Sequence, residues 1–356
     1  MKTNTSLLRH LSATAALVLA AASQMSFAQT TATTDPVGFV TLTIAGGGTP
    51  NNPKLTLVSP TLTQPIAWQG IISGITGNTI SVANNPWTVD QFNGAVNGLH
   101  YVEIISLTTP TKSGALSDIT GTTTGSVTTF DNLTAYAVVG DTIKIRKHVT
   151  IGSLFGVTNS AGLLATNDPT TADEVFIYDG SSSVPYFYYT GDVSSPAGWY
   201  DSAFSLNPGD AAKVDIGPHQ GVVIKRKASA SVTMLAQGAV KTGNTIFPVT
   251  NGLNVLGTVS AKGLTLGGSG LFTNNPATGV KATDDPTTAD EVLIYTATGP
   301  TPYFYYTGDV SSPAGWYDSA FTFAADLVAI APGTAFVLKR KGGGSFNWTL
   351  PSPSSF

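Results

Sequence analysis

The stretch PYFYYTGDVSSPAGWYDSAF occupies residues 185–204, and the same twenty letters occur again at residues 302–321, an offset of 117. On a strand, the side chains of YFYY alternate between two faces, so both faces carry large rings. The letters TGD and SSPAG that follow favour turns, and WY begins a second aromatic run. The stretch therefore predicts a β-hairpin or β-arch with a loop longer than two residues.

The repeat is wider than these twenty residues. The segment DPTTADEVFIY (168–178) matches DPTTADEVLIY (285–295), and VIKRK (223–227) matches VLKRK (337–341). A self-similar unit indicates one structural block that is used more than once. Two copies are too few for a solenoid, so the repeat predicts two homologous modules that arose by an internal duplication.

The rest of the chain has the pattern of an all-β protein. Short β-branched or aromatic runs, such as GFVTLTIAG (38–46) and HYVEIISL (100–107), alternate with segments rich in Gly, Thr, Ser, Asn and Pro. Turn signals at roughly ten-residue intervals are typical of sandwiches and barrels. We predict tandem β-sandwich or barrel-like modules, with the N-terminal part as a diverged third unit.

The first residues have the pattern of a secretory signal peptide. Lys2 and Arg9 precede an apolar run at 11–22, and Ser26-Phe27-Ala28 offers a small-x-small cleavage site. We therefore expect an exported protein of the periplasm, the cell surface or the extracellular space. The expected division is a signal peptide (1–28), an N-terminal β domain (29–148), a first repeat with connecting strands (149–263), a second repeat (264–351) and a tail (352–356).

Composition narrows the function classes. The chain has no cysteine, which excludes disulfides and thiolate ligands. Without residues 1–28 the net charge is −6, because that segment holds two cations and no acid. A mildly acidic chain argues against nucleic-acid binding, which needs clustered cations. No later segment has eighteen uninterrupted apolar residues, so we expect no transmembrane helix.

Each unit contains one glutamate and, farther along, one arginine. Beyond residue 28 the chain has three residues of each kind, which are Glu103, Glu174 and Glu291 and then Arg146, Arg226 and Arg340. Arginine favours paired hydrogen bonds to a carboxylate, so we predict the structural ion pairs Glu103–Arg146, Glu174–Arg226 and Glu291–Arg340. Chance composition and a functional cationic surface formed by the three Lys/Arg triplets are the alternatives.

The repeated aromatic residues have two interpretations. They form the core of each module, with tyrosine hydroxyls at its edge. Alternatively, they form an exposed platform on which sugar rings stack. The residues expected in such a platform are Tyr186, Tyr188 and Trp199 and their copies Tyr303, Tyr305 and Trp316.

The repeated DPTTADE segment brings carboxylates together in a loop. Calcium prefers such oxygen ligands, and the candidate ligands are Asp168, Asp173, Glu174, Asp285, Asp290 and Glu291. The spacing is not that of an EF-hand loop, and Asp-Pro-Thr-Thr is also an ordinary turn opening. We expect no cofactor, with calcium as the alternative.

Four segments carry a resemblance to a known family. They are DPVGFVTLTIAGG (35–47), GDTIKIRKHVTIGSLFG (140–156), TADEVLIY (288–295) and VLKRKGGGSFNWTLP (337–351). Together they resemble a paralogous family of secreted β-rich proteins of verrucomicrobial-type bacteria, to which no activity is assigned. The resemblance implies export and many sister copies, but it implies no site residues.

The sequence thus predicts a non-catalytic exported protein of the cell envelope, surface or matrix, with a structural or adhesive role and possible partners in its own copies. No H-E-x-x-H and no G-x-S-x-G occurs, and we assign no catalytic residue. The alternative is a protein that binds cell-surface polysaccharide through the repeated aromatic residues. The third hypothesis is an exported glycan hydrolase.

Overall fold

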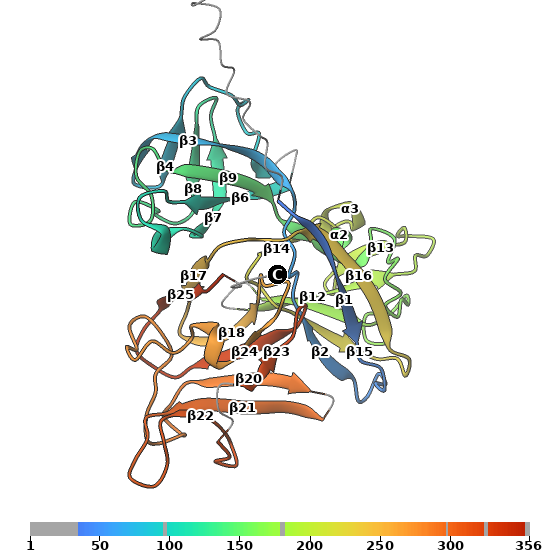
Figure 1. Ribbon diagram of the computed structural model, residues 1–356. Coiled ribbons are helices and arrows are strands. Elements are labelled where there is room, and N and C mark those ends of the chain that lie inside the picture. The colour runs from blue at the N-terminus through green and yellow to red at the C-terminus, as the bar shows by residue number, and fades with distance from the viewer. Residues whose placement is uncertain (1–34, 95–97, 179–181, 297, 324–326, 353–356) are drawn as a thin grey trace, which may run out of the picture. The chain divides into compact units, whose positions relative to one another are not determined.

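Figure 1 shows the computed structural model of the protein, which describes residues 35–94, 98–178, 182–296, 298–323 and 327–352. The expected signal peptide and all but the first residue of the expected tail lie outside the described residues. Within them, no helix is both long enough and apolar enough to cross a membrane.

The prediction of an all-β fold is confirmed. The helical segments of the described residues are short, and they are η1 (Pro110–Lys112), α2 (Ile151–Phe155), α3 (Pro208–Ala211) and η2 (Gly267–Ser269). The longest, α2, begins with a capping box in which Thr150 accepts a hydrogen bond from Ser153 N. It ends at Gly156, whose φ of +87° no side chain would adopt without strain.

A six-stranded barrel is formed by strands that follow one another closely in the sequence. Its strands are β6 (Gly98–Ile105), β7 (Leu116–Thr122), β8 (Ser126–Thr129), β4 (Thr79–Val82), β3 (Ile66–Thr76) and β9 (Thr142–Lys147), in that order around the barrel. The pairing of β9 with β6 closes it, and β5 (Asn93–Gly94) adds to β6. Branched aliphatic side chains alternate inward and fill the barrel, among them Ile72, Val102 and Ile143.

Two five-stranded antiparallel sheets contain the repeated sequence. The first has the order β13 (Gly198–Asp201), β12 (Ser183–Tyr189), β11 (Glu174–Tyr178), β15 (Val222–Arg226) and β2 (Lys54–Val58). The second has the order β22 (Gly315–Asp318), β21 (Gly299–Tyr306), β20 (Glu291–Thr296), β24 (Ala335–Arg340) and β18 (Gly252–Gly257). The repeated letters therefore occupy corresponding strands, and Tyr188 faces Trp199 as Tyr305 faces Trp316. The duplication itself stays a prediction.

Each sheet is accompanied by two smaller strand pairs. In the first repeat these are β1 (Val37–Ile44) with β16 (Val232–Ala239), and β10 (Val149–Thr150) with β14 (Asp215–Ile216). In the second they are β17 (Thr245–Val249) with β25 (Phe346–Leu350), and β19 (Leu264–Thr265) with β23 (Ala329–Ile330).

The strand pairing differs from the expected division at residue 148. Strands β1 and β2 precede the barrel in the sequence, but they pair with β16 and β15 of the first repeat. In Figure 1 the blue β1 accordingly lies beside the yellow β16. In the second repeat the corresponding β18 and β19 are joined by a short link. The barrel is thus an insertion between β2 and β10, rather than part of a separate N-terminal domain.

The two sheets meet through the same positions of each repeat. Leu57 and Val223 of one sheet share a core cluster with Val255 and Val337 of the other. Isolated bridges join Val58 to Thr334, and Leu256 to Gln220. Val58 and Leu256 are corresponding residues, because each faces the matching residue of β15 or β24. The arrangement is that of an isologous dimer interface within one chain.

Candidate functional site

The repeated strand β12 presents its rings on two faces with different surroundings. Tyr186 and Trp199 lie in the main core of the first repeat, and Tyr188 packs against it. Phe187, Tyr189 and Tyr200 form a separate cluster with Ala172. Adjacent residues of a strand point to opposite faces, which accounts for the division.

The six residues expected in a sugar platform belong to the inner face. Trp199 and Trp316 are 0% and 1% exposed, and Tyr188 and Tyr305 pack edge-to-face on them. Trp199 Nε1 donates to the carbonyl of Gly156 at 2.8 Å. The indoles are therefore core residues that sugars cannot reach. The expectation that Trp199 and Trp316 form part of a sugar platform is wrong.

The outer face carries an aromatic cluster that the sequence interpretation did not single out. Phe204 closes it and lies 5.0–5.4 Å from the rings of Phe187, Tyr189 and Tyr200. The residues of the first cluster are Phe187, Tyr189, Tyr200 and Phe204, and those of the second are Phe304, Tyr306, Tyr317 and Phe321. We call these the outer aromatic clusters.

The closing phenylalanine of each outer cluster has an unusual backbone. Phe204 has a φ of +53° and Phe321 a φ of +62°, a region that bulky side chains rarely adopt. Both residues are 43% exposed. The amide of Phe204 donates to the carbonyl of Asp201 at 2.9 Å, which fixes the turn. Two copies of the same sequence thus hold the same ring, partly exposed, at the surface.

The loop after β12 is tied to the outer cluster. Asp192 accepts hydrogen bonds from the amides of Ser194 and Ser195 at 2.7 and 2.8 Å. It also accepts one from the Tyr189 hydroxyl, which raises the pKa of Tyr189 to about 12. Tyr200 donates to the carbonyl of Pro196. Between these anchors, Val193 points fully into solvent, as does Val310 in the second copy.

The candidate calcium ligands have other partners. Asp168 accepts from the amide and hydroxyl of Thr170, as expected for a turn opening. Asp285, the copy of Asp168, accepts in the same way from Thr287. Asp173 and Glu174 are paired with cations, and so are their copies Asp290 and Glu291. Among the residues that the structure describes, no group of three or more histidine or carboxylate side chains is arranged to hold a metal ion.

The ion-pair prediction is right in the barrel and displaced by one residue in the repeats. Arg146 Nε lies 3.3 Å from Glu103. Arg226, however, pairs with Asp173, and Arg340 pairs with Asp290 at 2.6 Å. The glutamates pair with lysines instead, Glu174 with Lys225 and Lys227 and Glu291 with Lys339 and Lys341.

Strand register explains the displacement. Glu174 lies directly opposite Lys225, so these two side chains share a face and Arg226 points to the other. Asp173, one residue earlier, reaches the face of Arg226. In the barrel, Glu103 lies opposite Lys144, and Arg146 is its diagonal neighbour on the same face. The three arginines are buried, so they take no part in the alternative cationic surface.

A buried ionic cluster joins the barrel to the flanking segments. Glu103 pairs with Lys241, which follows β16, at 2.7 Å. Arg146 also contacts Asp35 and donates to the carbonyl of Gln64 at 2.9 Å. Burial would raise the pKa of Glu103, but the charges of Lys241 and Arg146 hold it below its usual value. The glutamate is therefore ionised and fixes both cations.

A second titratable cluster contains two of the histidines. His148, buried after β9, has its Nε2 3.0 Å from Asp118 of β7, without hydrogen-bond geometry. Burial raises the pKa of Asp215 to about 6 and lowers that of His219 to about 4. The charge of Asp118 raises both pKa values, and that of His148 lowers both. His148 Nδ1, Asp215 Oδ1 and His219 Nδ1 are buried without a partner among the described residues. The arrangement makes local stability depend on pH.

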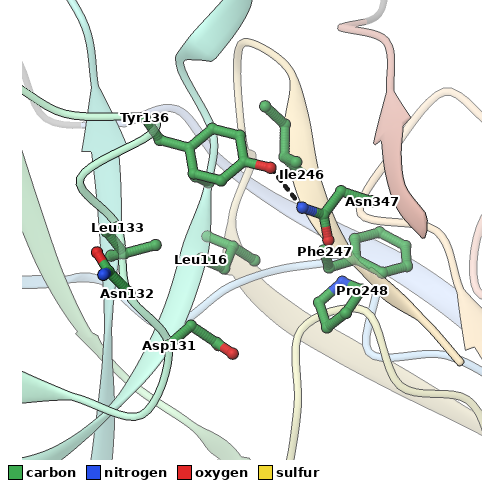
Figure 2. A pocket seen from close by; sticks show the side chains of 10 residues that line it. Leu116, Asp131, Asn132, Leu133, Tyr136, Ile246, Phe247, Pro248 and Asn347 are labelled. Carbon is green, nitrogen blue, oxygen red and sulfur yellow. Dashed lines mark hydrogen bonds between the residues drawn. The ribbon is translucent and has the colours of Figure 1, made fainter. Parts of the chain in front are cut away.

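A pocket of about 190 Å³ lies between the barrel and the β17–β25 pair (Figure 2). Gly114 and Ile246 position its walls, because the Ile246 amide donates to the Gly114 carbonyl at 2.8 Å. Gly114 has a φ of +97°, and a Cβ there would lie 1.9 Å from the carbonyl oxygen of Asn244. Across the pocket, the Asn347 amide donates to the Tyr136 hydroxyl. No sequence motif marks these residues, which come from segments far apart.

No protein-family model, no curated protein and no solved structure matches this chain. The resemblance to a secreted β-rich family therefore stays a prediction.

Proposed function

We propose that the protein is a non-catalytic, exported component of the cell envelope, surface or extracellular matrix, with a structural and adhesive role. The observation that supports this role is the exact repetition of one exposed surface. Each copy consists of the loop around Val193 or Val310 and the half-exposed ring of Phe204 or Phe321. We call these two regions the repeated surfaces.

A repeated surface favours bridging over catalysis. One site suffices to bind a ligand or turn over a substrate, but an adhesive must engage two partners at once. Two equivalent contacts on one chain multiply the strength of attachment when both are engaged. The exposed valine and phenylalanine add apolar area, which is the main source of association energy. The partner proposed here is a second copy of the chain, joined through the same surface.

Edge-to-edge strand pairing is less well supported as the mode of assembly. The outer edge strands of the two sheets, β13 and β22, are only four residues long. Short edge strands are a feature that limits pairing with other chains. The contacts between copies are therefore assigned to the loops and rings.

Light scattering after size exclusion, over a concentration series of residues 29–356 with and without calcium, tests the proposal. If the repeated surfaces bind each other, the wild-type protein grows into open chains. Val193→Ser or Val310→Ser alone leaves one surface and stops growth at the dimer, and the double variant is monomeric. The matched control is Val89→Ser, at an exposed valine of the barrel region. A wild-type monomer at every concentration would reject self-assembly.

The hydrolase and the polysaccharide platform remain the other proposals. The platform would have to use the outer aromatic clusters, since Trp199 and Trp316 are buried. Hydrolysis of none of a broad glycan and peptide panel would remove the hydrolase.

A further inference from the structure

The pocket in Figure 2 brings polar groups from both of its walls together. Asp131, Asn132 and Tyr136 come from the segment that follows β8, and Asn347 comes from β25. Figure 2 shows Asp131 and Asn132 on the barrel side and Pro248 opposite them. Convergent polar groups in a partly apolar hollow are the usual features of a small-molecule site.

The polar groups keep hydrogen-bonding capacity for a ligand. Asp131 Oδ2 accepts from Ser117 Oγ at 3.0 Å, and Asn132 Oδ1 accepts from the amide and hydroxyl of Thr134. In the described part of the chain, Asp131 Oδ1, Asn132 Nδ2 and Asn347 Oδ1 have no partner. The pocket therefore offers two acceptors, one of them a carboxylate oxygen, and an amide donor, which together match adjacent hydroxyl groups.

The charge and size of the pocket restrict the ligand. Asp131 is the one charged side chain among the lining residues that the structure describes, so anionic ligands are disfavoured. The volume of about 190 Å³ is below the roughly 300–1,000 Å³ of sites for drug-sized ligands. The half-buried ring of Tyr136 and the exposed ring of Pro248 supply apolar surfaces for C–H groups. A single neutral ring that carries hydroxyls meets all three conditions.

We propose that this pocket binds one neutral pyranose residue, held by Asp131, Asn132 and Asn347 and packed against Tyr136 and Pro248. The site is separate from the repeated surfaces, and the proposal does not depend on their role. The Asn347 amide donates to the Tyr136 hydroxyl. Tyr136 belongs to the barrel region and Asn347 to the second repeat, so a sugar bound here contacts both parts of the chain.

Saturation-transfer NMR on residues 29–356 tests the site. The probes are the methyl glycosides of glucose, mannose and galactose, and N-acetylglucosamine. We expect transfer to at least one of them. Asn347→Ala and Asp131→Ala should each weaken that binding about tenfold, the effect of losing roughly one hydrogen bond. Tyr136→Phe removes the hydroxyl that holds the Asn347 amide and retains the ring, and it should also weaken that binding.

The matched control is Asn52→Ala, because the Asn52 side chain is exposed and distant in sequence from every lining residue. It should bind as the wild type does, and so should the Val193→Ser, Val310→Ser double variant. Transfer to none of the four sugars would overturn the proposal. So would equal transfer in the wild type, Asn347→Ala and Tyr136→Phe, because these two variants change the pocket without touching a buried core residue.

Discussion

The guanidinium of Arg340 lies 2.6 Å from the carboxylate of Asp290, and both side chains are fully buried. Asp290 also accepts from the amides of Lys281 and Lys341, each at 2.7 Å. One carboxylate thus holds together the loop before β20 and the end of β24. Asp173 and Arg226 repeat the arrangement in the first repeat. In a chain without disulfides, these buried pairs tie loops to strands.

Asp290→Asn should destabilise the protein by about 3–5 kcal/mol, because it leaves the buried charge of Arg340 without a partner. Denaturant unfolding measures the loss. The matched control is Glu291→Gln, which removes partly exposed lysine contacts and should cost about 1 kcal/mol or less. Equal losses of stability in the two variants would contradict the assignment of the buried Arg340 pair to Asp290.

Trp316→Ala should cost about 3–5 kcal/mol in unfolding free energy, because it empties a fully buried site. Val310→Ala, nearby and fully exposed, should change stability by less than about 0.5 kcal/mol. Urea unfolding compares the two. A Trp316→Ala protein as stable as the wild type would contradict the burial of the indole.

Asp215→Asn should stabilise the protein at pH 7 by about 1–2 kcal/mol. The pKa of Asp215 is about 6 in the folded state and about 4 when exposed, so the folded state binds the proton more tightly. The stabilisation from protonation is present below pH 4 and lost as the pH rises through 6. His219 has the opposite dependence, but it contributes to both proteins and cancels in their difference.

Unfolding of the wild type and of Asp215→Asn at pH 4 and pH 7 checks this prediction. The stability difference should be largest at pH 7 and vanish near pH 4. Asp284→Asn, at an exposed carboxylate, is the control and should show no such trend. A difference that is independent of pH would show that Asp215 is not the titrating group.

Ile246→Ala should loosen the contact between β17 and the barrel. Ile246 is 5% exposed and packs in the barrel core, so its truncation should cost about 2–5 kcal/mol. Hydrogen exchange should become faster at the Ile246 amide, which donates to Gly114. Leu253→Ala, at a half-exposed leucine of β18, should leave that amide protected.

Local patterns in the sequence were sufficient to predict the all-β class. Turn residues and β-branched runs act over a few residues, so their signal survives without tertiary information. The Glu–Arg pairing in the barrel was predicted from composition instead, because each unit has one glutamate and one arginine and arginine favours carboxylate partners. It was misplaced in the repeats because register decides which of two adjacent acids shares a face with the arginine, and a one-residue difference reverses the face.

The membership of β1 and β2 in the first repeat was not visible in the sequence. Their partners are about 160 to 200 residues away along the chain, and no local pattern encodes such a pairing. The difference between the two faces of β12 was not visible in the sequence for a related reason. Tyr186 and Phe187 are both large aromatic residues, so the sequence pattern does not distinguish them. Only the packing of α2 and β16 shows that the face of Tyr186 belongs to the main core.

The inserted barrel separates the order of synthesis from the order of folding. The six barrel strands have all their partners once residue 147 has been made. Strands β1 and β2 are made earlier, but they wait for β15 and β16, and closing so long a loop is entropically costly. During that interval their open edges are templates for other chains. The early strands of the first repeat therefore stay unpaired over the longest stretch of synthesis, whereas the strands of the contiguous second repeat pair within residues 245–350.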